Sequence, residues 1–151
     1  MKWPLLYGIA ALSLVVFVMA QAEAPATFQW DASVDAATAP ANNPVKYRLY
    51  VSSTLPAGTV PTGATMHDTA LLLEHQVSFP SGTFYVFATA YWNALTVDGV
   101  PIAGSVVESG LSNVLKVEVK VPPGNPRNAR FKVTGVAQSQ TGQTVGFKRR
   151  G

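Results

Sequence analysis

The chain has no cysteine among its 151 residues. It therefore lacks disulfides, thiolate nucleophiles, cysteine zinc ligands and the acylated cysteine of a lipoprotein. Apolar residues at helical spacing are also scarce beyond residue 24, which argues against a helical domain. Glycine-rich loops of the kind that cradle phosphates are missing as well. These absences exclude most nucleotide-dependent and thiol-dependent enzymes.

Catalytic and metal-binding chemistry has few candidates. The two histidines are His67, which we expect in a loop, and His75, which falls at an inward position of a strand pattern. A zinc site needs three or four ligands at compact spacing, and no such cluster occurs. Ser105 lacks the flanking residues of a nucleophile elbow. The sequence predicts a protein that is not an enzyme and holds no cofactor or metal.

The amino-terminal segment has the pattern of an export signal. A short basic start, Met1-Lys2, precedes an apolar run over residues 5–19, and small residues surround Ala22 and Ala24. This order is typical of a secretory signal peptide cleaved after Ala22 or Ala24. The alternative is an uncleaved inner-membrane anchor, although the run is shorter than the ~20 residues that span a bilayer. We expect a periplasmic, secreted or virion-associated protein.

Charge is distributed unevenly along the chain. Residues 25–118 hold three basic and seven acidic residues, whereas residues 119–151 hold seven basic residues and no acid. Because only Phe131 and Phe147 interleave with the tail's basic residues, nucleic-acid binding is not expected. The tail instead complements the acidic body, in cis or between copies. The tail residues predicted to bind a partner are Arg127, Arg130, Lys132, Lys148, Arg149 and Arg150.

Alternation of apolar and polar residues predicts short strands separated by clusters of Gly, Pro, Asn and Asp. The predicted strands cover residues 26–33, 45–53, 71–79, 84–92 and 114–121. The segment 84–92 is apolar on both faces, as in a central strand. The residues expected to face the core are Phe28, Trp30, Tyr47, Leu49, Val51, Leu71, Leu73, Val77, Phe79, Leu115, Val117, Val119 and Val121. This pattern favours an all-β fold built as an antiparallel sandwich.

Four motifs together resemble the fibronectin type III family. FQWDAS resembles its strand B, KYRLYVS its strand C, FPSGTFYVFATAYW its E–F corner and strand F, and ESGLSN before VLKVEV the approach to strand G. The resemblance covers residues 26–121 and implies an immunoglobulin-like β-sandwich that binds, spaces or displays. It divides the chain into a signal helix over 1–24, a sandwich over 25–121 and a linker with basic tail over 122–151.

The sequence departs from the family pattern in three places. Phe84, which has no hydroxyl, occupies the position of the family's corner tyrosine. The loop 93–109 is long and contains Asp98-Gly99, a hairpin-turn signal. Little chain precedes Phe28 after cleavage, so strand A is short or missing.

The tail resembles the opening of a further repeat. VPPGNPRNARFKV resembles a linker leading into a strand A, and TVGFKRR is a candidate second strand, so the tail reads as a hairpin. We expect residues 128–133 to fill the edge that the missing strand A leaves open. A flexible polar tail is the alternative reading.

The candidate binding residues outside the tail lie at the end of strand 84–92 and in the following loop: Tyr91, Trp92, Asp98, Val100 and Ile102. Exposed aromatic residues beside a loop are typical of binding sites. The alternative for Tyr91 and Trp92 is packing against the loop's own apolar residues, including Val97. We expect a non-catalytic, exported binding or structural module that mediates protein–protein assembly at a cell envelope or virion surface. Two alternatives are an accessory carbohydrate-binding module that uses Trp92, and a membrane-anchored envelope or virion protein that retains its amino-terminal helix.

Overall fold

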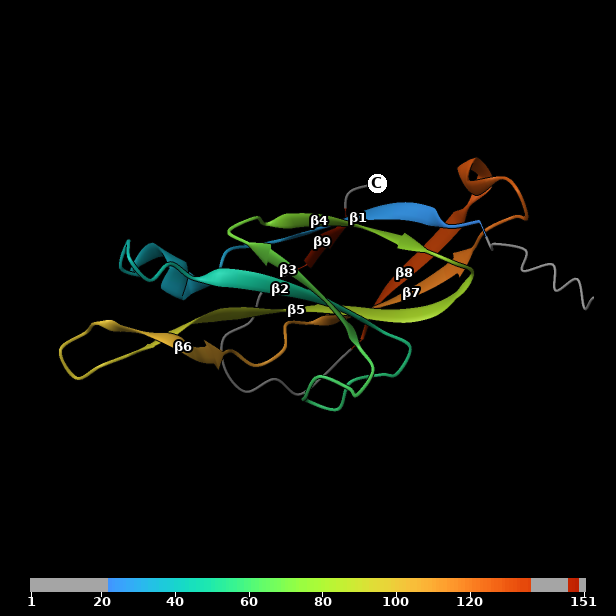
Figure 1. The fold of residues 1–151 in the computed structure, drawn as a ribbon. Coiled ribbons are helices and arrows are strands. Elements are labelled where there is room, and N and C mark those ends of the chain that lie inside the picture. Colours follow the sequence, from blue (N-terminus) through green and yellow to red (C-terminus); the bar gives the residue numbers. More distant parts are fainter. Residues whose placement is uncertain (1–21, 137–146, 150–151) are drawn as a thin grey trace, which may run out of the picture.

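The computed structural model describes residues 22–136 and 147–149 of the chain, and this part is all-β. Its strands form two antiparallel sheets that share one core in a sandwich-like arrangement (Figure 1). The predicted all-β fold with antiparallel sheets is therefore confirmed. The predicted signal segment, residues 1–24, lies almost wholly outside the described residues.

The smaller sheet has the strand order β4-β1-β9, and the larger sheet has the order β3-β2-β5-β7-β8, with β6 also pairing with β5. Two short 3-10 helices connect strands, η2 (Val34–Ala37) and η3 (Pro126–Asn128). The strands are β1 (Ala24–Trp30), β2 (Lys46–Ser52), β3 (Thr65–Ala70), β4 (Glu74–Phe79), β5 (Gly82–Leu95), β6 (Pro101–Glu108), β7 (Val114–Lys120), β8 (Arg130–Val136) and β9 (Phe147–Arg149).

The central strand β5 is 14 residues long and is paired along both edges. One edge pairs with β2, and the other pairs first with β7 and, farther along, with β6. Two serines fill the space between these partners. The amides of Ala88 and Ala90 donate to the hydroxyls of Ser112 and Ser109, both at 2.9 Å, and the serine amides donate back to the two alanine carbonyls at 2.8 Å. The segment ESGLSN thereby continues the pairing of β5 where no regular strand lies.

The main core lies between the two sheets. Phe28 and Phe79 from the smaller sheet meet edge to face, with ring centroids 5.8 Å apart, and they pack over Leu49 and Val117 of the larger sheet. All four side chains are almost fully buried. Burial of such a side chain contributes about 1.5–3 kcal/mol, so the period-2 alternation fixes which face of each strand turns inward. Phe84 also contacts this core through the Phe79 ring.

A second, smaller core covers the outer face of the larger sheet. Tyr50 stacks on Phe87 with ring centroids 5.4 Å apart, and Leu111 and Val114 close over them. This cluster explains why β5 is apolar on both faces. Alternation alone places Tyr50 on the outer side of its strand. It is nevertheless buried there, because the chain between β6 and β7, with Leu111, passes over it.

Two predictions about the segment 65–73 are wrong. His67 lies in strand β3, not in a loop, and Leu71 and Leu73 are 60% and 39% exposed rather than inward. The reason is that residues 71–73 cross from the larger sheet to the smaller one, after a turn in which Ala70 has a φ of 50°. The crossing brings His67 and His75 together, with ring centroids 4.9 Å apart.

The described part of the tail joins both sheets. β8 pairs with β7 from Val114↔Val136 to Lys120↔Arg130, and Phe131 and Val133 of β8 pack against the main core. The prediction that residues 128–133 fill the open edge of β1 is therefore wrong. That edge pairs with β9, in the register Phe28↔Arg149, so the two tail strands lie in different sheets and form no hairpin.

A chain that ends at Val121 should be less stable than the full chain. It loses β8 and β9, which uncovers the edge of β7, one edge of β1 and the apolar contacts of Phe131 and Val133. We expect a lower urea midpoint and concentration-dependent association through the newly open edges, measured by fluorescence and light scattering. An unchanged midpoint would show that the tail strands do not belong to the fold.

Candidate interaction surface

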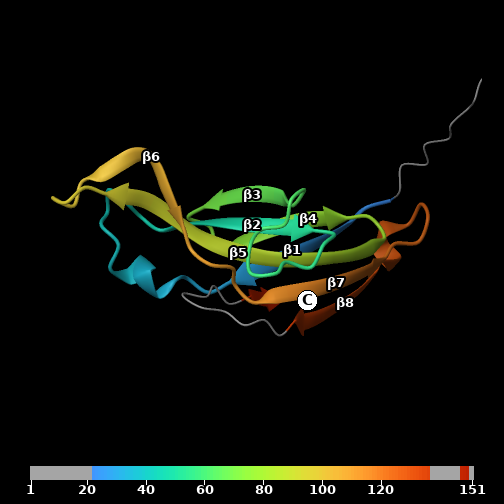
Figure 2. The ribbon, with the colours of Figure 1, turned by 90° about the horizontal axis from the view of Figure 1, so that it is seen from below.

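A β-hairpin projects from one end of the molecule, beyond the other strands (Figure 2). It consists of β5 from Tyr91 onward, the turn 96–100 and β6, and we call it the arm. The sequence predicts a long loop here, but most of these residues lie in the strands β5 and β6, which pair at the root of the arm and again beside its turn. The predicted turn signal is correctly placed, because Gly99 has a φ of +79° that favours glycine.

Hydrogen bonds close the turn of the arm. The amide of Thr96 donates to the carbonyl of Val100 at 2.8 Å, and the amide of Gly99 donates to the carbonyl of Thr96 at 2.9 Å. The Thr96 hydroxyl accepts from the amide of Val100 at 3.0 Å. The tip is therefore a defined turn, and it presents Asp98 to solvent.

The arm exposes apolar side chains on both of its faces. Val97 is fully exposed, and the others are between 39% and 57% exposed. Exposed apolar residues that gather on one projection mark a binding surface more often than scattered ones do. The residues of this set are Leu95, Val97, Val100, Ile102, Val106 and Val107.

The root of the arm is fixed by an asparagine and by a carboxylate. The side chain of Asn43 donates to the carbonyl of Asn93 at 2.8 Å and accepts from its amide at 3.1 Å, as a neighbouring strand would. On the outer face, the carboxylate of Glu108 accepts from Arg48 at 2.9 Å, from the Tyr50 hydroxyl at 2.6 Å and from the Thr89 hydroxyl.

The Glu108 carboxylate thus joins three strands, since Arg48 and Tyr50 lie on β2, Thr89 on β5 and Glu108 at the end of β6. Burial raises the pKa of Tyr50 to about 12, with further contributions from its hydrogen bond to Glu108 and from that charge. Hydrogen bonds to a charged group are stronger than hydrogen bonds between neutral groups. The three bonds to the Glu108 carboxylate therefore strongly stabilise the packing of the end of β6 against β5 and β2.

Tyr91 belongs to an adjoining polar group. It is 9% exposed, and its hydroxyl lies 2.9 and 2.8 Å from the two carboxylate oxygens of Asp68. The guanidinium of Arg48 lies 4.2 Å above its ring. Burial, followed by the hydrogen bond to Asp68, raises the pKa of Tyr91 to about 12. This predicted binding residue is therefore used inside the molecule.

Trp92 is half-buried and packs against the main core. It also lines a hollow of about 350 Å³ together with Asp35, Pro40, Asn43 and Leu95. Of the loop residues Val97, Val100 and Ile102 that were the alternative packing partners of Trp92, Val97 is fully exposed and takes no part in such packing.

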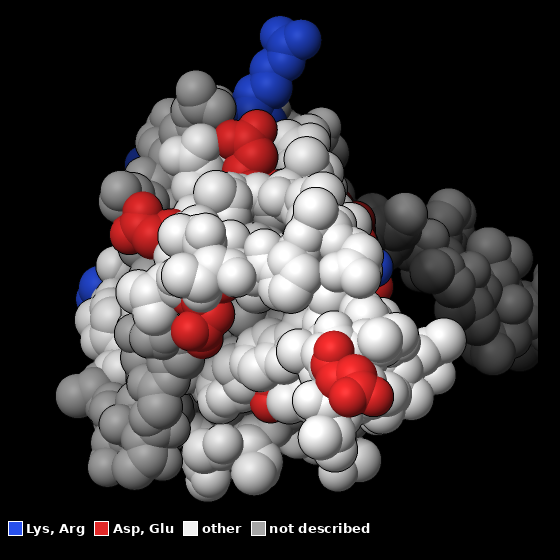
Figure 3. Space-filling model, turned by 90° about the vertical axis from the view of Figure 1, so that its left-hand side faces the viewer, with Lys and Arg blue, Asp and Glu red and all other residues white. Residues whose placement is uncertain are grey.

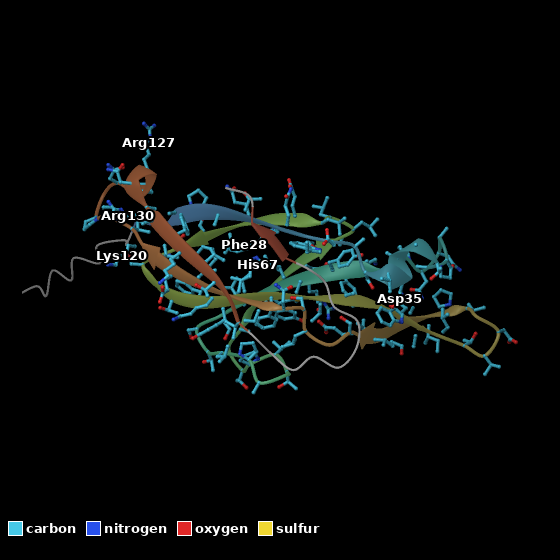
Figure 4. The ribbon with its side chains drawn as sticks, turned by 180° about the vertical axis from the view of Figure 1, so that it is seen from behind. Phe28, Asp35, His67, Lys120, Arg127 and Arg130 are labelled. Carbon is cyan, nitrogen blue, oxygen red and sulfur yellow. The ribbon has the colours of Figure 1, made fainter. Side chains whose placement is uncertain are left out.

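The basic tail residues form a surface at the opposite end from the arm. Figure 4 shows Lys120, Arg127 and Arg130 gathered there, far from Asp35, which lies near the arm. Arg127 lies on η3, where its amide donates to the side chain of Asn125 at 3.2 Å. Lys132 lies on β8, 4.0 Å from Glu118.

Two of the remaining predicted tail residues lie on a strand of the smaller sheet. Lys148 and Arg149 lie on β9, where their backbone pairs with that of Gln29 and Phe28 in the smaller sheet. Arg150 lies outside the described residues.

Sequence reasoning missed the residues that hold the arm. Arg48 and Tyr50 alternate with core residues, so the strand pattern predicts only that they face outward, and it gives no role to Thr89 or Glu108. The sequence does hold one signal. Arg48 and Tyr50 lie two residues apart on one strand and Thr89 and Tyr91 two residues apart on another, so each pair shares a face of its strand. Glu108, at the end of the next strand, is the acid that could reach that face.

Comparisons with protein-family models, with curated protein sequences and with solved structures give no match for this chain. The described residues contain no group of three or more His, Asp or Glu side chains that could hold a metal ion. Within the same part of the chain, no helix has the length and hydropathy needed to cross a membrane.

Replacement of Glu108 by alanine should destabilise the fold by about 1–3 kcal/mol, since Arg48, Tyr50 and Thr89 lose a common acceptor in a partly buried place. The free energy of urea unfolding measures this. The matched control is Glu118→Ala, because Glu118 also forms ion pairs, with Lys116 and Lys132, but on the exposed surface. Equal effects of both substitutions would contradict the special role of Glu108.

The two tyrosines predict a pH dependence at high pH. A tyrosine whose pKa is raised by folding stabilises the fold fully below its ordinary pKa of about 10, and the contribution is lost as pH rises through the folded value. Stability should therefore fall between about pH 10 and pH 12. Ultraviolet titration of tyrosinate should show two late groups in the folded protein, and Tyr50→Phe should remove one of them. Titration of every tyrosine near pH 10 in the folded state would refute this assignment.

Proposed function

We propose that this protein is a non-catalytic, exported binding or structural module of the fibronectin type III kind. Its role is protein–protein assembly at a cell envelope or virion surface. The order of strand motifs in the sequence and the sandwich-like pair of sheets support the module. The export pattern of residues 1–24 supports the location.

The arm is the observation that carries this proposal. A hairpin that exposes six apolar side chains has no benefit for the fold itself, because Val97 and Val100 contact little of their own molecule. Yet Glu108 and Asn43 hold its root in one arrangement. A preorganised apolar projection loses little conformational entropy on binding, which is the property of a docking element.

The hollow beside Trp92 favours one second candidate, a carbohydrate-binding module. An indole that is partly exposed next to the polar side chains of Asp35 and Asn43 resembles a surface on which a sugar ring stacks. In that case a glycan screen should show binding that Trp92→Ala abolishes. A screen without any binding glycan would remove this candidate.

The assembly proposal predicts that the arm touches another protein molecule in the native envelope or particle. A photo-cross-linking residue placed at Val106 should give a covalent product with a protein, whereas the same residue at Met66 should not. Met66 is a matched control, because it is 48% exposed, as Val106 is 46% exposed, but lies on β3 away from the arm. Mass spectrometry identifies the product. Equal labelling from both positions, or none from Val106, would contradict the proposal.

A further inference from the structure

The tip of the arm is a single negative charge within an apolar strip. Asp98 is the only charged residue between positions 94 and 107. It is exposed at the turn, next to Val97, which is fully exposed, and Val100, which is 57% exposed. Figure 3 shows this end of the molecule, with isolated carboxylates on a surface that is otherwise largely uncharged. The tip therefore offers one carboxylate flanked by apolar side chains.

The opposite end holds a groove with the complementary charge. Two adjoining hollows, of about 510 and 810 Å³, share Lys120 and Arg130 in their linings, and we call them together the basic groove. The larger hollow has no acidic residue in its lining and is completed by Ser81, Val121, Pro122, Asn128 and Ala129. Its walls thus combine positive charge with apolar surface.

The pairing of β7 with β8 leaves that positive charge only partly compensated, because Glu118 is the one acid in the lining of the groove and already pairs with Lys116 and Lys132. Lys120 lies directly opposite Arg130 in the strand register, and like charges in this position repel each other. The next pair, Glu118 and Lys132, has opposite charges and lies 4.0 Å apart. Among the described residues, neither Lys120 nor Arg130 takes part in an ion pair. An added carboxylate between them would relieve the repulsion.

We propose that the arm tip of one copy inserts into the basic groove of the next copy, so that copies join head to tail. The carboxylate of Asp98 pairs with Lys120 and Arg130, while Val97 and Val100 pack against the wall formed by Val121 and Pro122. This inference rests on the proposed assembly function and names the partner as a second copy. A copy supplies both the carboxylate and the apolar flanks that the groove accommodates, whereas a free phosphate supplies only the charge.

The position of the two surfaces determines the form of the assembly. They lie at opposite ends of one molecule, as Figures 1 and 4 show, so the contact between copies is heterologous. Such a contact does not end with a pair, because each added copy still offers a free tip and a free groove. Head-to-tail contacts therefore produce a ring or a filament, which suits a structural protein of an envelope or particle.

Charge exchange tests the proposal in the mature, exported protein by sedimentation velocity at low salt. The wild-type sedimentation coefficient should rise with protein concentration, and salt should reverse the rise by screening the contact. Asp98→Lys alone should remain monomeric, as should the double variant Lys120→Glu with Arg130→Glu. A mixture of these two proteins should associate again, because each tip then meets a groove of opposite charge.

Two further variants separate loss of the contact from loss of the fold. Asp98→Asn keeps a residue suited to the turn and should still weaken association by about tenfold, since it removes the charge. Asp35→Lys makes the same change of charge as Asp98→Lys at the same end of the molecule, but on η2 instead of at the tip of the arm, and should leave association unchanged.

Several results would overturn the proposal: a wild-type protein that stays monomeric at every concentration, association that Asp98→Asn does not weaken, or a mixture of charge-exchanged variants that stays monomeric. Binding of wild-type monomers to vesicles rich in anionic lipid, lost on Lys120→Glu, would instead assign the groove to a headgroup. If Val106 cross-links to a different protein while Asp98→Asn has no effect, the assembly function stands and the head-to-tail contact is wrong.

Discussion

The pairing of β5 along both of its edges is the constraint on which the rest of the structure depends. A strand that is apolar on both faces must be covered on both, and β5 has the main core on one side and the Tyr50–Phe87 cluster on the other. Its edges are closed by β2 and by the chain that returns from the arm tip. The returning chain pairs through backbone groups in β6 and β7 and through serine hydroxyls between them.

The arm follows from this arrangement as an extension of the same strand. The last pair between β5 and β2 is Lys46↔Tyr91. Beyond it, β5 continues to Leu95 and pairs with β6 along its opposite edge. A two-stranded ribbon on its own is marginally stable in water. Here Glu108 and Asn43 attach its root to the body, so a short apolar hairpin can project without folding back. The exposed apolar surface is then available to a partner.

The sequence predicted the core because its cause is local. Alternation in 45–53 and 114–121 placed Tyr47, Leu49, Val117 and Val119 correctly, since each faces inward by the period of a strand. The same rule failed for Leu71 and Leu73, because the chain there crosses between sheets and has no strand period. The turn at Asp98-Gly99 was predictable from its residue types, whereas the strands on either side of it were not, because their pairing depends on the bulged return of residues 102–105.

The groups that hold the arm were not predictable in the same way. Glu108 joins residues about sixty positions apart in the chain, and no local pattern shows which cation or hydroxyl it meets. The destination of the tail also depends on tertiary structure. Residues 130–136 have the alternation of a strand, but this pattern does not say which edge they join. They pair with β7 over their whole length, and this position also packs Phe131 and Val133 against the main core.

The arm is an ordered element of the fold and not a mobile loop. Hydrogen–deuterium exchange of the segment 92–108 in the folded protein tests it most directly. The account predicts that paired amides of this segment exchange at least about a hundredfold slower than in an unstructured chain, and that Glu108→Ala removes much of this protection. Exchange of the whole segment at the rate of an unstructured chain would contradict the account.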